Sequence, residues 1–281
     1  MKAANEIKFN RISQFILIIV LLFIAAFMLL PFFWVFATSL RLPADSFKMP
    51  PSFFPTKWNW TNYLYVFTAV PFGRFIFNSL FVTVTITIVQ LIFAAMAAYA
   101  FSRFNFKGKN FLFIYILTGL MIPFQSICVA QFFLISKMGL VNTLTAITIP
   151  YFASSFSIFL IRQFMQTIPR SYDEAALIDG ANRFQIFWKV ILPMSVPPIM
   201  VCGFMTFIAQ WNNFFAPLIY LNSQDKYTLP LGMKLLSGHQ SVGSLSVIFA
   251  GVILSLILPA IAYCFGQKYL IQGTVLSGVK S

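Results

Sequence analysis

Residues 12–40 read ISQFILIIVLLFIAAFMLLPFFWVFATSL, a long run of mostly apolar side chains. A helix needs about 20 such residues to cross the roughly 30 Å hydrocarbon core of a bilayer. The run exceeds the roughly 7–15 apolar residues of a signal peptide, and no cleavage site of small residues follows it. We therefore expect it to remain in the protein as a first membrane helix.

More stretches of the same kind follow along the chain, which is 59% hydrophobic and only 9% charged. A soluble domain carries about 25% charged residues, so lipid is the solvent that fits this composition. Strands of a membrane barrel would alternate in polarity over segments of about ten residues, whereas these runs are continuous. We predict one all-α transmembrane domain over residues 1–281 with six membrane helices. They lie near residues 12–38, 73–101, 111–136, 143–165, 194–221 and 245–270.

The net charge of +13 comes from basic residues scattered between the apolar runs. They form no basic stripe and no recognition motif, so a nucleic-acid partner is not expected. Membrane proteins concentrate Lys and Arg in their cytoplasmic loops. With a cytoplasmic N-terminus, the inside segments hold twelve of the 19 basic residues, which favours both termini in the cytoplasm. The twelve are Lys2, Lys8, Arg11, Arg103, Lys107, Lys109, Arg162, Arg170, Arg183, Lys189, Lys268 and Lys280.

Several chemistries have no support in the sequence. No Asp or Glu lies within the six predicted spans, although carriers driven by ion gradients usually bury carboxylates there. The chain has no Walker A signature, so we expect ATP to be bound elsewhere. Cys128, Cys202 and Cys264 stand alone in apolar runs, without metal-ligand spacing. We expect no enzyme activity, no metal and no cofactor on this chain.

The first predicted outside loop, about 39–72, is rich in proline and aromatic residues, including Trp58, Trp60, Tyr63 and Tyr65. Trp and Tyr are enriched at the level of lipid head groups, so the loop is expected to lie on the membrane surface. The alternative is a contact surface for an external partner.

One inside loop, about 167–193, reads TIPRSYDEAALIDGANRFQIFWKVILP. Ser171 and Glu174 have the S-x-x-E spacing of a capping box, which predicts the start of a short helix. The pair Asp179 and Gly180 predicts its end, because glycine accepts the left-handed conformation found there.

A second helix is expected after this turn. Phe184, Phe187, Trp188 and Ile191 have the spacing of one helix face, and Pro193 marks the start of the fifth membrane helix. The predicted structure is a helix, a sharp turn and a helix on the cytoplasmic surface. By periodicity alone, an amphipathic hairpin that lies on lipid explains the loop equally well.

The residues of this loop resemble the EAA signature of bacterial ABC importer permeases, in which Gly and then I-x-L-P follow at fixed spacing. Val190 stands where the signature usually has Ile. The resemblance implies that the loop docks onto a separate ATPase and couples ATP hydrolysis to transport. The coupling residues would be Glu174, Ala175, Ala176, Asp179, Gly180, Ala181, Phe184 and Pro193.

Other segments resemble the carbohydrate-uptake, MalG-like group of these permeases. They are Pro31–Arg41, Met121–Pro123, Gly139–Thr143, Trp211–Phe214 and Gln272–Ser281, while Ala130–Gln131 departs from the Pro-Leu of many relatives. The resemblance implies a bacterial cell-membrane protein that assembles with a second homologous permease, two ATPase subunits holding ATP and Mg, and an extracellular sugar-binding protein. It also implies that the tail contacts the ATPase through Gly278, Val279 and Lys280.

Uncharged polar residues within the apolar spans are candidates for the sugar pathway. They are Gln131, Gln210, Trp211, Asn212 and Asn213. The alternative is hydrogen bonding between helices, which contributes about 0.6 kcal/mol per bond. Other functions that stay open are an ABC permease for another solute, such as glycerol phosphate, and an autonomous secondary carrier. The latter would have no use for an EAA loop.

Overall fold

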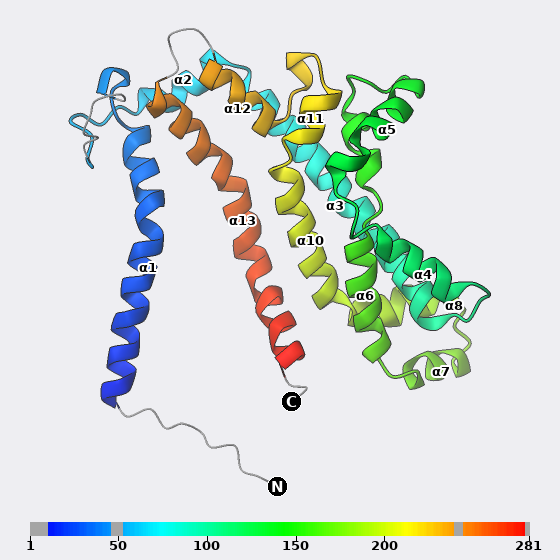
Figure 1. The fold of residues 1–281 in the computed structure, drawn as a ribbon. Coiled ribbons are helices and arrows are strands. Elements are labelled where there is room, and N and C mark those ends of the chain that lie inside the picture. Colours follow the sequence, from blue (N-terminus) through cyan, green and yellow to red (C-terminus); the bar gives the residue numbers. More distant parts are fainter. Residues whose placement is uncertain (1–10, 46–52, 239–243, 279–281) are drawn as a thin grey trace. The chain divides into compact units, whose positions relative to one another are not determined.

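The computed structural model describes residues 11–45, 53–238 and 244–278, and within these ranges every regular element is a helix (Figure 1). Four of these helices are long and apolar enough to cross a membrane, and a bent pair raises the number to five. The chain is therefore an all-helical membrane protein. The spans are Ile12–Ser39, Phe72–Arg103, Leu144–Thr167 and Leu245–Lys268, with Arg183–Met194 and Val196–Trp211 as the bent pair.

The helices group into two compact units, one made of residues 1–69 with 236–254 and the other of residues 70–235 with 255–281. The elements of the first are α1 (Arg11–Ser39), the 3₁₀ turn η1 (Pro43–Asp45), α2 (Thr61–Ala69), the end of α12 (Leu229–Gly238) and the beginning of α13 (Leu245–Gly278).

Polar contacts tie α2 of the first unit to the end of α1. The amide of Asn62 donates to the carbonyls of Ser39 and Arg41 at 2.8 Å each, and the Ser39 and Tyr63 hydroxyls are 2.7 Å apart. These bonds satisfy carbonyls that the end of α1 would otherwise leave unpaired. Within the unit, the large apolar side chains of α1 are exposed along most of its length, as lipid contact requires.

The second unit contains most of the chain. Its elements are α3 (Phe72–Arg103), α4 (Lys109–Thr118), α5 (Phe124–Lys137), η2 (Leu144–Ile147), η3 (Ile149–Tyr151), α6 (Ser155–Thr167), α7 (Ser171–Ile178), α8 (Arg183–Ile186), the π-helical segment η4 (Phe187–Ile191), α9 (Leu192–Met194), α10 (Val196–Trp211), α11 (Phe215–Tyr220), η5 (Gln224–Lys226), most of α12 and the rest of α13.

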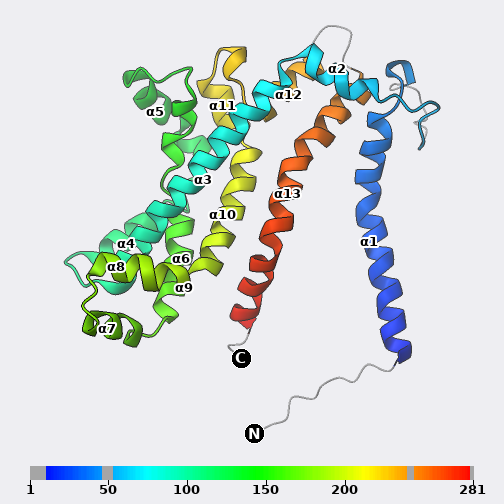
Figure 2. The same ribbon diagram turned by 180° about the vertical axis from the view of Figure 1, so that it is seen from behind.

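Helix α3 is the centre of the second unit and packs against both α6 and α10 (Figures 1 and 2). Ala94, Ala95 and Ala98 are buried in the shared core. Their small side chains let the helices approach each other closely. Gln90 joins the three helices by donating to Ser157 Oγ at 3.1 Å and to Thr206 Oγ1 at 2.7 Å.

The continuous helix expected over 111–136 is wrong, because residues 119–123 divide it into α4 and α5. Pro123 has no N–H to continue α4 and disfavours a helical conformation at the residue before it. A side chain at Gly119 would place its Cβ 2.5 Å from Ser155 Oγ, so the break also lies close to the start of α6.

Two other expected spans are less regular than predicted. The one over 143–165 begins with the short 3₁₀ segments η2 and η3 before α6 starts. The one over 194–221 ends its main helix at Trp211, and α11 is a separate short helix. The helix that precedes α10 meets it at an angle of 76° around Ser195 (Figure 2).

Candidate functional site

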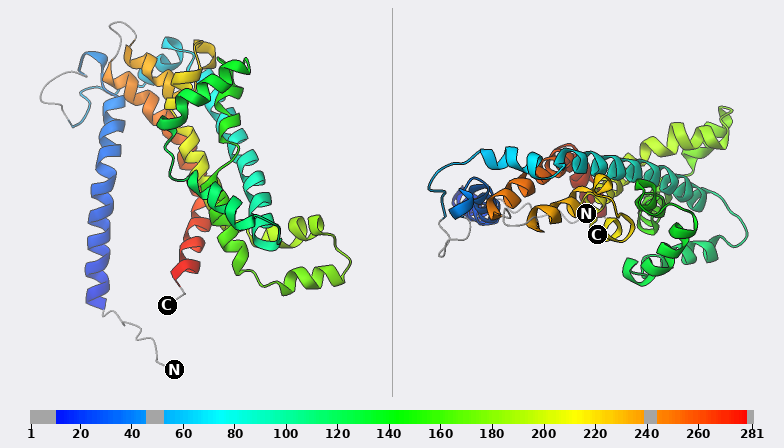
Figure 3. Two further views of the ribbon diagram at one scale, coloured as in Figure 1. Left: turned by 45° about the vertical axis from the view of Figure 1, so that its right-hand side comes forward. Right: turned by 90° about the horizontal axis from the view of Figure 1, so that it is seen from above.

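Residues 168–195, which we call the hairpin, follow α6 and lead into α10. In Figure 3 the hairpin projects from the end of α6 as two arms joined by a turn. The first arm is α7 and the second consists of α8, η4 and α9. The structure therefore contains the helix, turn and helix that the sequence predicts over 167–193.

The predicted capping box at the start of α7 is wrong. Ser171 is the first residue of the helix, and Arg170 at the cap position makes no side-chain bond to the backbone. Arg170 already has a helical backbone, and its carbonyl accepts the N–H of Glu174 at 3.0 Å. Because the helical hydrogen bonds begin one residue earlier, Ser171 is not in a position to cap them.

The predicted end of α7 at Asp179 and Gly180 is confirmed. Gly180 has φ +81°, and its N–H donates to the carbonyl of Leu177 at 3.0 Å. The N–H of Ala181 reaches back to Ala176 at 2.9 Å, which completes a Schellman motif. No atom lies within 4 Å of a Cβ built at Gly180, so backbone conformation alone requires glycine.

The second arm has a cap that the sequence reasoning missed. The side chain of Asn182 accepts the N–H of Gln185 at 2.9 Å, and Gln185 Oε1 accepts the N–H of Asn182 at 2.8 Å. This reciprocal pair is a capping box with Asn and Gln in place of Ser and Glu. The N-x-x-Q spacing of Asn182 and Gln185 in the sequence could have predicted this cap.

The four aromatic and aliphatic residues expected on one face of this arm divide into two pairs. Phe187 and Ile191 are buried, whereas Phe184 is 64% exposed and Trp188 is 41% exposed. The physical reason is the π-helical segment η4, which departs from the 3.6-residue period on which the prediction was based.

A buried ion pair attaches the first arm to the end of α3. Arg103 Nε lies 3.1 Å from Asp173 Oδ2, and the two side chains are only 5% and 7% exposed. Arg103 Nη2 also donates to the carbonyl of Ile168 at 3.0 Å. Neither carboxylate oxygen of Asp173 accepts a hydrogen bond among the described residues, so the Arg103 charge is its main compensation.

The same end of α3 also contacts the second arm. The Tyr99 hydroxyl donates to the carbonyl of Arg183 at 3.2 Å, and its ring lies 5.1 Å from the Phe187 ring. Both arms are thereby tied to one transmembrane helix. Sequence reasoning missed this connection, because nothing in the separate segments shows that Arg103 and Asp173 meet.

The residues of the EAA-like signature lie mostly on the surface of the hairpin. Exposed positions are Glu174, Ala175, Asp179, Gly180, Phe184 and Pro193, whereas Ala176 and Ala181 are half-buried against the core. Leu177 and Ile178 are also exposed. An apolar exposed patch on a pre-formed hairpin is typical of a surface that contacts another protein.

The polar residues expected along the pathway do not form one cluster. Gln210 accepts the amide of Asn213 at 3.1 Å, and both line a small cavity of about 10 Å³ with Ser79 and Thr228. Asn212 is exposed on another side, where it donates to the carbonyl of Ile208 at 2.8 Å.

The other two pathway candidates have packing contacts. Trp211 is buried, and its indole N–H donates to the carbonyl of Ser255 at 3.1 Å. Gln131 is half-buried and accepts the hydroxyl of Tyr220 at 3.1 Å. Of the five candidates, only Gln210 and Asn213 line one shared small void, and the pathway assignment stays a prediction.

Comparison with known proteins decides the family. Residues 90–271 match the family described as the inner membrane component of binding-protein-dependent transport systems. The chain belongs to this family. Its members are transport permeases and not enzymes, and the apolar spans of this permease place it in the inner membrane.

Relatives of this permease cover most of its length. An arabinooligosaccharide transport permease of Halalkalibacterium halodurans is 34% identical over 81% of the chain and 82% of the relative. A diacetylchitobiose uptake permease of Streptomyces coelicolor is 30% identical over 98% and 90%, respectively. A chain of a bacterial ABC transporter involved in alginate import has the same fold, with a TM-score of 0.80, 25% identity and coverage of 96% and 99%.

The C-terminal tail of the permease is described only in part. Gly278 is the last residue of α13, while Val279 and Lys280 lie outside the described residues. The predicted ATPase contact of the tail stays a prediction.

Proposed function

We propose that this permease imports an oligosaccharide in an ABC transporter, and that the hairpin 168–195 transmits the movement of the ATPase to the membrane helices. The permease acts with a second homologous permease, two ATPase subunits that bind ATP and Mg, and an extracellular binding protein. The observation that carries the proposal is the exposed hairpin attached to α3 through the buried Arg103–Asp173 pair.

The hairpin has the two properties that coupling requires. Its surface offers two carboxylates, Glu174 and Asp179, together with the exposed apolar side chains of Leu177, Ile178 and Phe184. Its inner face is held to α3 by contacts from both arms, so a force on the hairpin reaches α3 as a rigid-body movement.

Six spans follow if α4 and α5 cross the membrane as one interrupted segment. Both are short and apolar, with 10 and 14 residues, and together with the turn at 119–123 they have the length of a span. This arrangement places the N-terminus, the hairpin and the C-terminus on the cytoplasmic side. Labelling of a cysteine at position 107 by an impermeant reagent on intact cells would contradict it.

An oligosaccharide is the substrate class that the described residues and the relatives favour. Gln210, Asn213, Ser79 and Thr228 gather uncharged polar groups around a void of about 10 Å³, which is no larger than one water molecule, so a sugar could reach them only after the helices separate during transport. Two of the relatives are named for arabino-oligosaccharides and diacetylchitobiose. A glycerol phosphate would instead call for cationic side chains along the path.

Glu174→Lys is the direct test of docking. We expect the variant to insert in the membrane but to lose co-purification with its ATPase and substrate-stimulated ATP hydrolysis in proteoliposomes. Asp225→Lys makes the same charge reversal at an exposed acid outside the hairpin and should retain both. Wild-type coupling in Glu174→Lys would return the hairpin to a lipid-facing role.

The substrate is tested with the assembled transporter and a panel of labelled oligosaccharides. We expect at least one to be accumulated in an ATP-dependent manner, while glycerol phosphate is not. Accumulation of glycerol phosphate alone would refute the sugar assignment and leave the coupling proposal intact.

The tail contact has a separate test. Deleting residues 274–281 should reduce stimulated ATP hydrolysis more than membrane insertion. Normal transport by the truncated chain would show that Gly278, Val279 and Lys280 have no part in coupling.

A further inference from the structure

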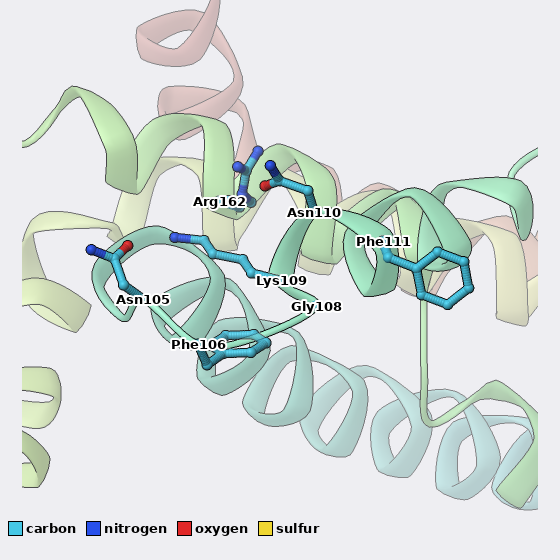
Figure 4. A pocket seen from close by; sticks show the side chains of 7 residues that line it. All are labelled: Asn105, Phe106, Gly108, Lys109, Asn110, Phe111 and Arg162. Atoms are coloured by element: carbon cyan, nitrogen blue, oxygen red, sulfur yellow. The ribbon is translucent and has the colours of Figure 1, made fainter.

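A hollow beside the start of α4 has a chemistry that transport does not use. It has a volume of about 430 Å³ and lies between the turn 105–108, the first residues of α4, and Arg162 of α6. Figure 4 shows the polar ends of Lys109, Asn110 and Arg162 on the same side of the turn, with the ring of Phe111 away from them.

Both cations of the hollow are held in place by this chain. The Lys109 amine donates to the carbonyl of Phe104 at 2.7 Å, and Arg162 Nε donates to the carbonyl of Phe101 at 3.4 Å. The guanidinium of Arg162 lies 3.9 Å from the centre of the Phe113 ring. These contacts keep the charges at the hollow, where a flexible side chain would otherwise move into solvent.

The positive charge has no acidic partner here. In the described part of the chain no ion pair joins Lys109 or Arg162 to a carboxylate, and the nearby Asp173 is paired with Arg103. The Lys109 amine and the Arg162 guanidinium both line the hollow, and their like charges repel each other. An anion in the hollow would remove this repulsion and complete the site.

The surroundings distinguish among possible anions. Helix α4 starts at the hollow, has no buried residue, and exposes the large apolar side chains of Phe111, Ile114 and Tyr115. A cationic hollow continuous with an exposed apolar helix matches a molecule with an anionic head and apolar chains. Basic pockets between membrane helices bind the phosphates of lipid head groups in this way.

We propose that the hollow binds an anionic phospholipid, with its phosphate between Lys109 and Arg162 and its acyl chains along α4. The amide groups of Asn105 and Asn110, which line the same hollow, can donate to the remaining phosphate oxygens. The N-terminal end of α4, where the helix dipole is positive, lies at the hollow and favours the same charge.

The test is lipid binding by the purified full-length permease, measured by native mass spectrometry with phosphatidylglycerol and phosphatidylcholine. We expect a preference for phosphatidylglycerol that K109Q/R162Q weakens by roughly 5-fold for each cation removed. The matched control K107Q/K189Q removes two exposed cations that do not line the hollow, and it should keep the preference. The charge-preserving variant K109R/R162K should also bind, which separates loss of charge from misfolding.

Three results would overturn the proposal. Equal binding of both lipids by the wild type would show that the hollow does not select a charged head group. Binding of inorganic phosphate in place of the lipid, at the same two cations, would identify a free anion as the ligand. Loss of the bound lipid when the ATPase subunits are added would indicate an acidic protein segment as the occupant.

Discussion

Each end of α3 is attached to a neighbouring segment by an ion pair, but one pair is buried and the other is exposed. At its last residues, the Arg103–Asp173 pair is 3.1 Å apart with side chains 5% and 7% exposed. At its first turn, the Arg74–Asp225 pair is 3.6 Å apart with side chains 59% and 49% exposed. The buried pair is strongly coupled to the fold, whereas the exposed one is screened by water.

The segments attached to the two ends of α3 also differ in their other contacts and in the surface that they expose. At the first end, Arg74 Nε donates to the carbonyl of Asp225 at 2.8 Å, and the neutral amide of Asn78 donates to the carbonyls of Asp225 and Tyr227 at 3.0 Å each. Asn142 adds a second neutral clip by accepting the N–H groups of Asn222 and Ser223 at 3.0 Å each. The other end buries its charge and exposes an apolar surface on the hairpin. If the hairpin transmits force as proposed, substitutions at its end of α3 should affect coupling, whereas substitutions at the opposite end should affect stability alone.

The largest effect is expected from breaking the buried pair. Arg103→Ala or Asp173→Ala leaves one buried charge without its partner, which costs about 3–5 kcal/mol of stability. We expect a clearly lower thermal midpoint of the purified permease and loss of ATPase coupling.

A double variant sharpens this prediction. Arg103→Met with Asp173→Leu removes both charges, and apolar replacement of a buried pair is often neutral for stability. Thermal unfolding should therefore be closer to wild type in the double variant than in either single variant. Additive losses in the double variant would show that the two residues do not act as a pair.

An intermediate effect is expected at the polar cavity near the first end of α3. Gln210→Ala or Asn213→Ala leaves a polar partner unpaired, which costs roughly 1–3 kcal/mol. If the cavity contacts sugar, transport should fall while assembly of the transporter is retained. Asn212→Ala removes the neighbouring exposed amide, and it should transport normally in the same uptake assay. Normal transport by the first two variants would make the pair a packing contact.

Two glycines with left-handed backbones allow the hairpin to be compared with the segment near Asn142 under similar backbone strain. Gly180 in the hairpin has φ +81° and Gly139 near Asn142 has φ +68°, with no neighbouring atom within 4 Å of either added Cβ. Valine at each should cost about 1–2 kcal/mol from the left-handed conformation. Only Gly180→Val should reduce ATP hydrolysis coupled to transport. Equal loss of coupling in Gly139→Val would erase the distinction between the two ends.

The smallest effect is expected at the exposed pair. Arg74→Gln should change stability by about 0–1 kcal/mol, and the difference should shrink further at high salt. Comparing thermal midpoints of this variant at low and high ionic strength gives the measurement. A loss as large as that of Arg103→Ala would mean that exposure does not separate the two pairs.

The sequence by itself determined the class of the protein and the outline of its hairpin. Long apolar runs dictate membrane helices, because in lipid the backbone must satisfy its own hydrogen bonds. The end of α7 could also be predicted from local sequence, because the left-handed backbone at Gly180 requires glycine. The EAA-like spacing could be read from the sequence for the same reason, because it is contained in one continuous stretch of chain, and the coupling role that it implies stays a prediction.

Only the tertiary structure decided which distant residues meet. Arg103 and Asp173 belong to separate segments, and a charge pattern along the chain does not say which of six acids pairs with which base. The separation of Asn212 from Gln210 and Asn213 also depends on tertiary structure. Because α10 ends at Trp211, these neighbouring side chains lie in different surroundings. Local propensity sets where helices begin and end, whereas pairing, burial and the π-helical shift at 187–191 depend on how those helices pack.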